Sequence, residues 1–332
     1  MTASDLTSAL RCPPAWRLPA VAAAVGLAAW WAMPDQLGLL TRMAISALLV
    51  LSLDLVVGIA GLATLGHAAL FGVGAYAAGI FAQRLHPDPL LGLAVGVAAG
   101  ALMAAASGAF LLRYSGFTFL MLTIAVAQIT ASLAQKARDW TGGDDGLTGF
   151  TVGPVFGRFA FDLEGRTAAL YALGVLVLGL YVARRVVNSP FGLTVRGIHQ
   201  NRSRMAALGT PVVWRLLAMY TLAGALAGAA GAVSAHTSAI VGLDSLSFAV
   251  SAEALVMLIL GGAGQLRGAL IGAVLFTLLH HTAASINPYH WLFVIGAALM
   301  LVVLVPPHKV WAAVQRRWQR RSAAAGAAKR AA

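Results

Sequence analysis

The feature that most constrains this chain is a series of apolar stretches along its length, each about twenty residues long. An α-helix rises 1.5 Å per residue, so about twenty residues cross a hydrocarbon core of about 30 Å. Hydrophobic residues make up 60% of the chain and charged residues 10%, whereas a soluble domain carries about 25% charged residues. A water-soluble fold could not cover so much apolar surface with so few charges. The sequence therefore predicts an all-α integral membrane protein.

We predict about ten transmembrane helices in a single membrane domain over residues 15–306, between cytoplasmic tails at 1–14 and 307–332. The first apolar run is interpreted as a span and not a signal peptide, because Trp30 and Trp31 occupy its end like interface anchors. The break between residues 60 and 61 is poorly marked, and one span is short. The expected spans are 15–33, 39–60, 61–82, 89–112, 117–138, 167–187, 213–235, 249–262, 266–286 and 290–306.

The uneven distribution of Arg and Lys predicts an orientation. With both termini in the cytoplasm, 17 of the 23 basic residues face inward and 6 face outward. Residues 139–166 then form the main external loop, and residues 184–215 form the main cytoplasmic loop, which holds six Arg and no acid. The basic tail follows a membrane span, so it suits anionic lipid head groups better than nucleic acid.

Motifs for catalysis and for metal or nucleotide binding are missing from the sequence. The glycine-rich run 261–268 lacks the lysine–hydroxyl ending of a phosphate loop and is interpreted as a turn. His280, His281 and His290 have no acidic neighbours, and Cys12 is the only cysteine. We therefore predict no catalytic residue, metal or cofactor in this chain, and no enzymatic activity.

Among the polar residues inside predicted spans, four are candidates for a translocation path: Asp54, His67, Gln128 and Glu253. Ionisable side chains in a membrane usually face the protein interior or a hydrated path, because lipid solvates them poorly. Two interpretations stay open, namely a translocation path and structural hydrogen bonding inside the helix bundle. The sequence favours the structural one for Asp54, His67 and Glu253, since an isolated buried carboxylate is very costly.

Glycine is concentrated in two places. Five glycines between Gly61 and Gly79 predict either a close helix crossing or an interrupted helix, because each costs about 1 kcal/mol against Ala in a helix. Gly224, Gly228 and Gly231 lie on one helix face and predict a packing contact.

The arginine-rich loop contains signals for a short amphipathic helix. Ser189 and Pro190 form a typical helix start, and Gly209 followed by Thr210 and Pro211 forms a stop. We expect one helix over residues 191–208 outside the lipid. Two interpretations are docking on a cytoplasmic partner and adsorption to anionic lipid.

Six sequence blocks stand out along the chain: SLDLVVGIAGLATLGHAALFGVGAYAAG from Ser52, GFTFLMLTIAVAQI from Gly116, WTGGDDGLTGF from Trp140, NSPFGLTVRGIHQNRSRMAALGTP from Asn188, LAGALAGAAGAV from Leu222 and LILGGAGQLRGALIGA from Leu258. In this order they resemble the permeases of branched-chain amino acid ABC importers, and the long external loop resembles the M-type subunit of that family.

The resemblance implies a type II importer fold in a bacterial inner membrane, with this chain forming half of a path for branched-chain or related amino acids. It implies a second homologous permease, two cytoplasmic ATPase subunits and an external solute-binding protein as partners. Urea, short amides and aromatic acids stay open as substrates, and an ion-coupled secondary carrier stays open as an alternative function.

The resemblance also assigns residues. It implies an ATPase coupling loop that contains Ser189, Pro190, Arg196, His199, Gln200, Arg202, Arg204 and Gly209. The external loop motif contains Gly142, Gly143, Asp144, Asp145 and Gly146. The chain departs from the family pattern at Asp54, where Asn is usual, and at His199 and Arg202, which replace an Arg and an acid.

Overall fold

A computed structural model describes residues 17–32, 36–155, 157, 159, 165–286, 296 and 300. The expected span at 290–306 lies outside the described residues apart from those last two, and both predicted tails lie outside them entirely.

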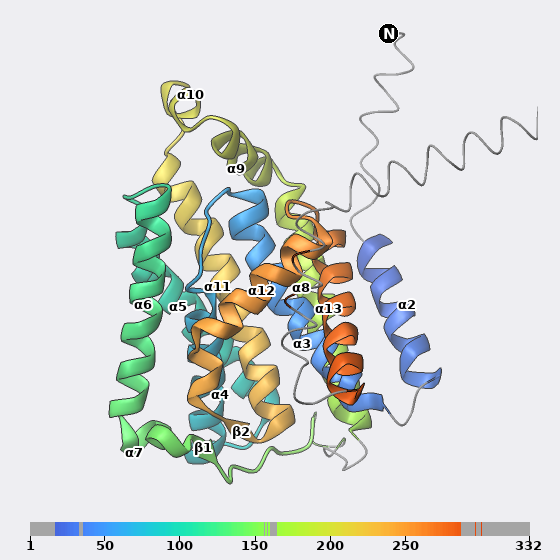
Figure 1. The fold of residues 1–332 in the computed structure, drawn as a ribbon. Helices are drawn as coiled ribbons and strands as arrows, with labels where there is room; N and C mark the ends of the chain where they lie inside the picture. Colours follow the sequence, from blue (N-terminus) through green and yellow to red (C-terminus); the bar gives the residue numbers. More distant parts are fainter. Residues whose placement is uncertain are drawn as a thin grey trace, which may run out of the picture.

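The described chain is a bundle of nine longer helices (Figure 1). They are α2 (Arg17–Ala32), α3 (Leu37–Asp54), α4 (His67–Arg84), α5 (Pro89–Leu111), α6 (Phe117–Lys136), α8 (Arg166–Val187), α11 (Val212–Ser238), α12 (Phe248–Gly261) and α13 (Leu266–Ile286). The short elements are η2 (Leu55–Ile59), α7 (Arg138–Thr141), η3 (Gly143–Asp145), β1 (Leu147–Thr148), α9 (Pro190–Gln200), α10 (Arg202–Ala207), β2 (Ile240–Val241) and η4 (Leu243–Leu246).

Helix length and composition confirm the helical membrane class. Six of the described helical segments are long and apolar enough to cross a membrane, and α2 and α12 are shorter apolar helices. The six are Leu37–Ile59, Pro89–Leu111, Phe117–Lys136, Arg166–Val187, Val212–Ser238 and Leu266–Ala283.

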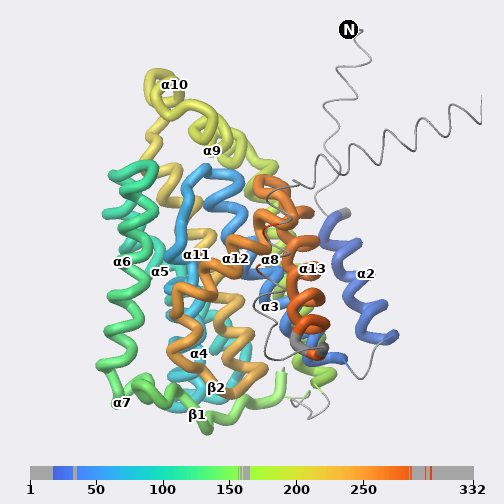
Figure 2. Tube along the Cα trace, viewed as in Figure 1, coloured from blue at the N-terminus to red at the C-terminus, as the bar shows by residue number. Residues whose placement is uncertain are grey.

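Successive helices run in alternating directions, so the two long loops lie at opposite ends of the bundle (Figures 1 and 2). Helices α9 and α10 cover one end, which we call the α9 end. Helix α7 and the strands β1 and β2, which pair antiparallel with Leu147 opposite Val241, cover the other.

Helix α11 is the centre of the bundle and packs closely against α4 and α5 through glycines. A Cβ added at Gly228 would meet the Gly96 carbonyl oxygen, and one at Gly74 would meet the backbone of Gly228. A Cβ at Gly231 would meet the Phe71 carbonyl oxygen. The predicted packing face is thus confirmed, because only glycine permits backbones to approach this closely.

The expected span at 61–82 is wrong at its start. Helix α4 begins at His67, and the residues from Gly61 to Gly66 are not helical. Two glycines sit at the ends of this stretch, with Gly61 at φ 72°. Of the two outcomes expected from the glycine cluster, the structure therefore contains an interrupted helix, and it also contains a close crossing at Gly74, where a Cβ would meet the Gly228 backbone.

Candidate functional site

The interruption between α3 and α4 is the most unusual backbone feature inside the bundle. Helix α3 ends at Asp54, passes into the π-helix η2, and the chain then extends through residues 61–66, which we call the extended segment. Along it, Leu62, Thr64 and Gly66 are buried, while Gly61 and Ala63 are exposed. One edge of the extended segment therefore packs into the bundle and the other is open.

Side-chain hydroxyls accept hydrogen bonds from backbone amides of this segment and of the first turn of α4. Thr123 Oγ1 on α6 accepts from Leu65 N at 3.3 Å, and Ser251 Oγ on α12 accepts from Ala68 N at 2.8 Å. Thr64 Oγ1 accepts from Gly66 N at 3.2 Å. Non-helical backbone at membrane depth is tolerated only where protein or water satisfies its polar groups, so these contacts hold the segment in place.

His67 begins α4 and is 1% exposed. Ser52 Oγ lies 2.6 Å from the Leu49 carbonyl oxygen and 2.8 Å from His67 Nε2. A hydroxyl has one proton, and Ser52 donates it to Leu49, so His67 Nε2–H must donate to Ser52. This bond supports the structural interpretation of His67: the ring ties α4 to α3 across the interruption.

Asp54 is fully buried at the junction of α3 and η2. Its Oδ1 accepts from Gly264 N at 2.6 Å, which ties α3 to the turn between α12 and α13. Gly58 lies beside this bond, and a Cβ there would meet both Asp54 Oδ1 and Gly264 N. The carboxylate is thus a cross-link between two helix ends, and Gly58 is required to admit it.

The structure does not bring the four polar candidates together. Asp54 and His67 are buried, whereas Gln128 on α6 and Glu253 on α12 are exposed on the surface of this chain. The expectation that Glu253 is a buried, internally hydrogen-bonded acid is therefore wrong. The helical period of α12 accounts for this difference. Ser251 and Ala254 lie three residues apart and face the bundle, so Glu253 between them lies on the outer face of the helix.

The arginine-rich loop of residues 184–215 forms two helices, not the single one expected. Ser189 Oγ accepts from Gly192 N at 3.4 Å and Pro190 is the first residue of α9, as predicted. Helix α9 stops at Gln200, and Asn201 Oδ1 accepts from Arg204 N at 2.9 Å to cap α10. The sequence pattern does not reveal this cap, because an N-cap inside an arginine-rich run resembles an ordinary polar helix residue.

Helix α9 has an inner face that contacts the bundle. Val195 and Ile198 are fully buried in it. A Cβ added at Gly61 would meet the ring of His199, so this side chain lies directly on the start of the extended segment. Helix α9 thus connects the arginine-rich loop of residues 184–215 to the extended segment.

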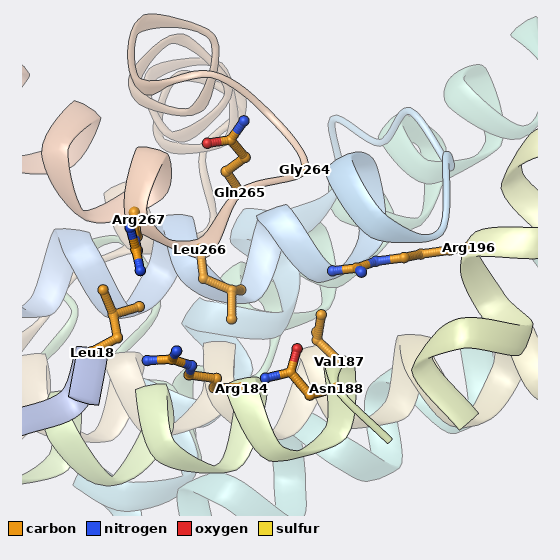
Figure 3. Close-up of a pocket in the computed structure, with 9 residues that line it drawn as sticks. All are labelled: Leu18, Arg184, Val187, Asn188, Arg196, Gly264, Gln265, Leu266 and Arg267. Carbon is orange, nitrogen blue, oxygen red and sulfur yellow. The ribbon is translucent and has the colours of Figure 1, made fainter. Parts of the chain in front are cut away.

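The outer face of the loop carries exposed apolar and polar residues, which we call the docking face: Leu193, Gln200, Arg204 and Leu208. Leu193 is 62% exposed and Leu208 is 72% exposed. Arg202 is half-buried, and Gly209, at φ 79°, ends the loop. Arg196 points inward instead, into a pocket at the ends of α8 and α13 (Figure 3).

The external loop motif is a compact turn built on left-handed glycines. Gly142, Gly143 and Gly146 have φ of 78°, 63° and 71°. Asp144 accepts from Gln135 Nε2 at 2.7 Å and forms an exposed ion pair with Arg138 at 3.3 Å, while Asp145 is exposed. The motif leads directly into β1 and so fixes the strand against β2.

Ser52, Gly58, Thr123 and Ser251 are site residues that the sequence did not single out. Each is a small residue in an apolar helix, which is more often a packing position than a hydrogen-bonding one. Their significance depends on the extended segment beside them, which hydropathy does not reveal.

A bundle of membrane-length helices with one helix interrupted by a non-helical segment, and with an amphipathic loop at one end, is the architecture of a polytopic membrane protein. A model of the family described as branched-chain amino acid transport system, permease component, matches residues 36–304. The chain belongs to this family, and this membership does not favour the ion-coupled carrier.

Two curated relatives are similar to this chain over most of its length. Both are the high-affinity branched-chain amino acid transport system permease protein LivM. The one from Salmonella typhimurium is 28% identical over 295 residues, covering 80% of this chain and 68% of the relative. The one from Escherichia coli K12 is 28% identical over 284 residues, covering 78% and 66%. The matched region spans about two thirds of these relatives, and no solved structure matched the chain.

Proposed function

We propose that this chain is the M-type permease subunit of an ATP-driven importer of branched-chain or related amino acids. A second homologous permease, two cytoplasmic ATPase subunits and an external solute-binding protein complete the transporter. The relatives named for branched-chain amino acid transport support the substrate class. The contact between His199 on α9 and Gly61 on the extended segment is the observation that carries the mechanism.

In this mechanism an ATPase subunit binds the docking face and moves α9. Apolar side chains as exposed as Leu193 and Leu208, placed beside Arg204, suit an interface with an apolar core and a charged rim. The inner face of α9 passes the displacement through His199 to Gly61. The extended segment can change shape at low cost, because few hydrogen bonds hold its backbone: Leu62 N donates to the Val56 carbonyl oxygen and Leu65 N donates to Thr123 Oγ1.

The translocation path would run between two permeases, so its lining is open in a single chain. Helices α6, α12 and α4 are neighbours, and α6 and α12 expose Gln128 and Glu253. Ala63 and Gly61 form the open edge of the extended segment. A polar side chain exposed on a membrane helix is costly in lipid, and enclosure by a second permease removes that cost. Asp54 and His67 support this path as structural residues.

The proposed topology has about ten spans of the type II importer kind, with both termini and the α9 end in the cytoplasm. Ser203 on α10 and Asp145 in the external turn are both exposed and lie in loops at opposite ends. With Cys12 replaced by Ser, an impermeant thiol reagent added to intact cells should label Asp145→Cys and miss Ser203→Cys. The reverse pattern would contradict this orientation.

Charge reversal on the docking face tests the function. Arg204→Glu should reduce co-purification of the ATPase subunits and uptake of a radiolabelled branched-chain amino acid, because charge-assisted contacts favour the arginine. Arg113→Glu is the matched control, since Arg113 is also an exposed arginine, in the connection between α5 and α6. Wild-type uptake and co-purification in Arg204→Glu, at normal protein level, would remove the docking role from this face. Robust ATP hydrolysis by the isolated chain would contradict the subunit assignment itself.

A further inference from the structure

Beside the docking face, the α9 end contains a basic pocket to which neither the transport cycle nor the family description gives a role. Its volume is about 270 Å³, and three of its lining residues are arginines on three different helices: Arg184 on α8, Arg196 on α9 and Arg267 on α13. Asn188 and Leu18 also line the pocket. In Figure 3, Arg184 and Arg267 extend toward the same side of the pocket, and Arg196 enters from the opposite side.

The charges in this pocket are of one sign. None of the described lining residues is acidic. Arg184 and Arg267 lie within electrostatic range of each other. Asp54, whose Oδ1 accepts from Gly264 N, is within electrostatic range of Arg196. The pocket therefore has three arginines and one described acid near it, and an external anion would add favourable charge contacts with Arg196 and Arg267.

We propose that this pocket binds the phosphate head group of an anionic membrane phospholipid. Guanidinium groups in a fork geometry match phosphate oxygens, and the Asn188 side-chain amide adds a donor. Basic pockets between helices at the cytoplasmic side are a recurrent form of head-group site.

The surfaces below the pocket identify the anion as a lipid. Leu18 of α2 and Leu266 of α13 lie on its wall, so both helices border the pocket. Along α2, Val21 is 59% exposed and Val25 is 64% exposed, and along α13, Ile271 is 63% exposed. A head group in the pocket would thus continue into acyl chains along two apolar helix faces, which a free phosphate ion could not use.

The test is lipid retention by the full-length chain purified in a mild detergent, measured by native mass spectrometry with phosphatidylglycerol and phosphatidylcholine as probes. The wild type should retain phosphatidylglycerol in preference to phosphatidylcholine. Arg267→Gln should lower that retention, and Arg184→Gln with Arg267→Gln should lower it by roughly tenfold or more. The matched control, Arg202→Gln with Arg204→Gln, removes the same charge from α10 and should retain the lipid.

Because Arg184 is buried, a loss of retention counts only where the lipid-free variant keeps the thermal unfolding temperature of the wild type. Arg267 is exposed, so the single variant supplies this measurement if the double variant unfolds. Equal retention by the wild type and Arg267→Gln would overturn the proposal. So would equal loss in the α10 control, or equal stabilisation by inorganic phosphate alone, which would assign the pocket to a free ion. Displacement of the lipid by an ATPase subunit would assign the arginines to a protein carboxylate instead. None of these outcomes depends on transport, so they separate this proposal from the proposed function.

Discussion

The crossing of α11 with α4 and α5 and the extended segment at residues 61–66 are both rich in glycine, but glycine serves opposite purposes in them. At the crossing, Gly228 lies within a continuous helix and lets backbones touch. At the extended segment, Gly61 adopts a left-handed conformation and ends a helix. The difference lies in the surrounding side chains: apolar and small at the crossing, but Ser and Thr around the segment. One region is therefore a rigid axis, and the other is held by a few replaceable hydrogen bonds.

The largest expected effect is at the crossing. Gly228→Leu should prevent stable folding or cost more than about 3 kcal/mol, because its side chain would meet the Gly96 backbone, which cannot rotate away. Gly174→Leu is the control, since Gly174 is also helical and has open space at its Cβ. Thermal unfolding in detergent measures both. A normal unfolding temperature for Gly228→Leu would show that the crossing is not a rigid axis.

A smaller effect on the free energy of unfolding is expected at Ser251, whose hydroxyl holds the backbone that follows the extended segment. Ser251→Ala leaves the Ala68 N–H without its acceptor and should cost about 1–3 kcal/mol. Amide exchange should rise over residues 61–68 and stay unchanged along α11. Ser203→Ala, at an exposed position on α10, should alter neither measurement. If Ser251→Ala raised exchange equally in α11, the two regions would be one cooperative unit.

The smallest effect on stability, and the one most specific to coupling, is at Gly61. Gly61→Ala places a methyl group against the His199 ring and in a left-handed backbone, which costs about 1–2 kcal/mol. Gly149→Ala carries the same backbone strain at φ 76° with nothing near its Cβ. Uptake should fall in Gly61→Ala, stay normal in Gly149→Ala, and recover in part when His199→Ala is added to Gly61→Ala. Absence of that recovery would mean that His199 does not transmit the motion.

The sequence predicts the crossing better than the extended segment, for a physical reason. Glycines spaced by a helical period directly encode a close contact, so the spacing of Gly224, Gly228 and Gly231 is sufficient to identify the packing face of α11. Hydropathy also locates α13 at the expected residues 266–286. An interruption is encoded differently, because its acceptors, Thr123 and Ser251, lie 58 and 183 residues from the donors they satisfy. Hydrogen bonds between residues so far apart depend on the tertiary fold, so no local sequence pattern indicates them.

The site residues show the same division. The Ser189–Pro190 helix start is a local signal and is present in the structure, whereas the exposure of Glu253 depends on how α12 is rotated against its neighbours. The inward direction of Arg196 depends likewise on the pocket between α8 and α13. An arginine-rich loop predicts a basic surface, but it does not predict which arginines point away from that surface.

The most direct test of the central claim, that α9 transmits partner motion to the extended segment, is hydrogen–deuterium exchange on the assembled transporter. Exchange would be compared without nucleotide and with ATP trapped on the ATPase subunits. We expect protection to change over residues 61–68 and over α9, while α11 around Gly228 stays unchanged, and we expect His199→Ala to abolish the change at 61–68. An unchanged extended segment, with the nucleotide-dependent change confined to the α11 crossing, would contradict the account.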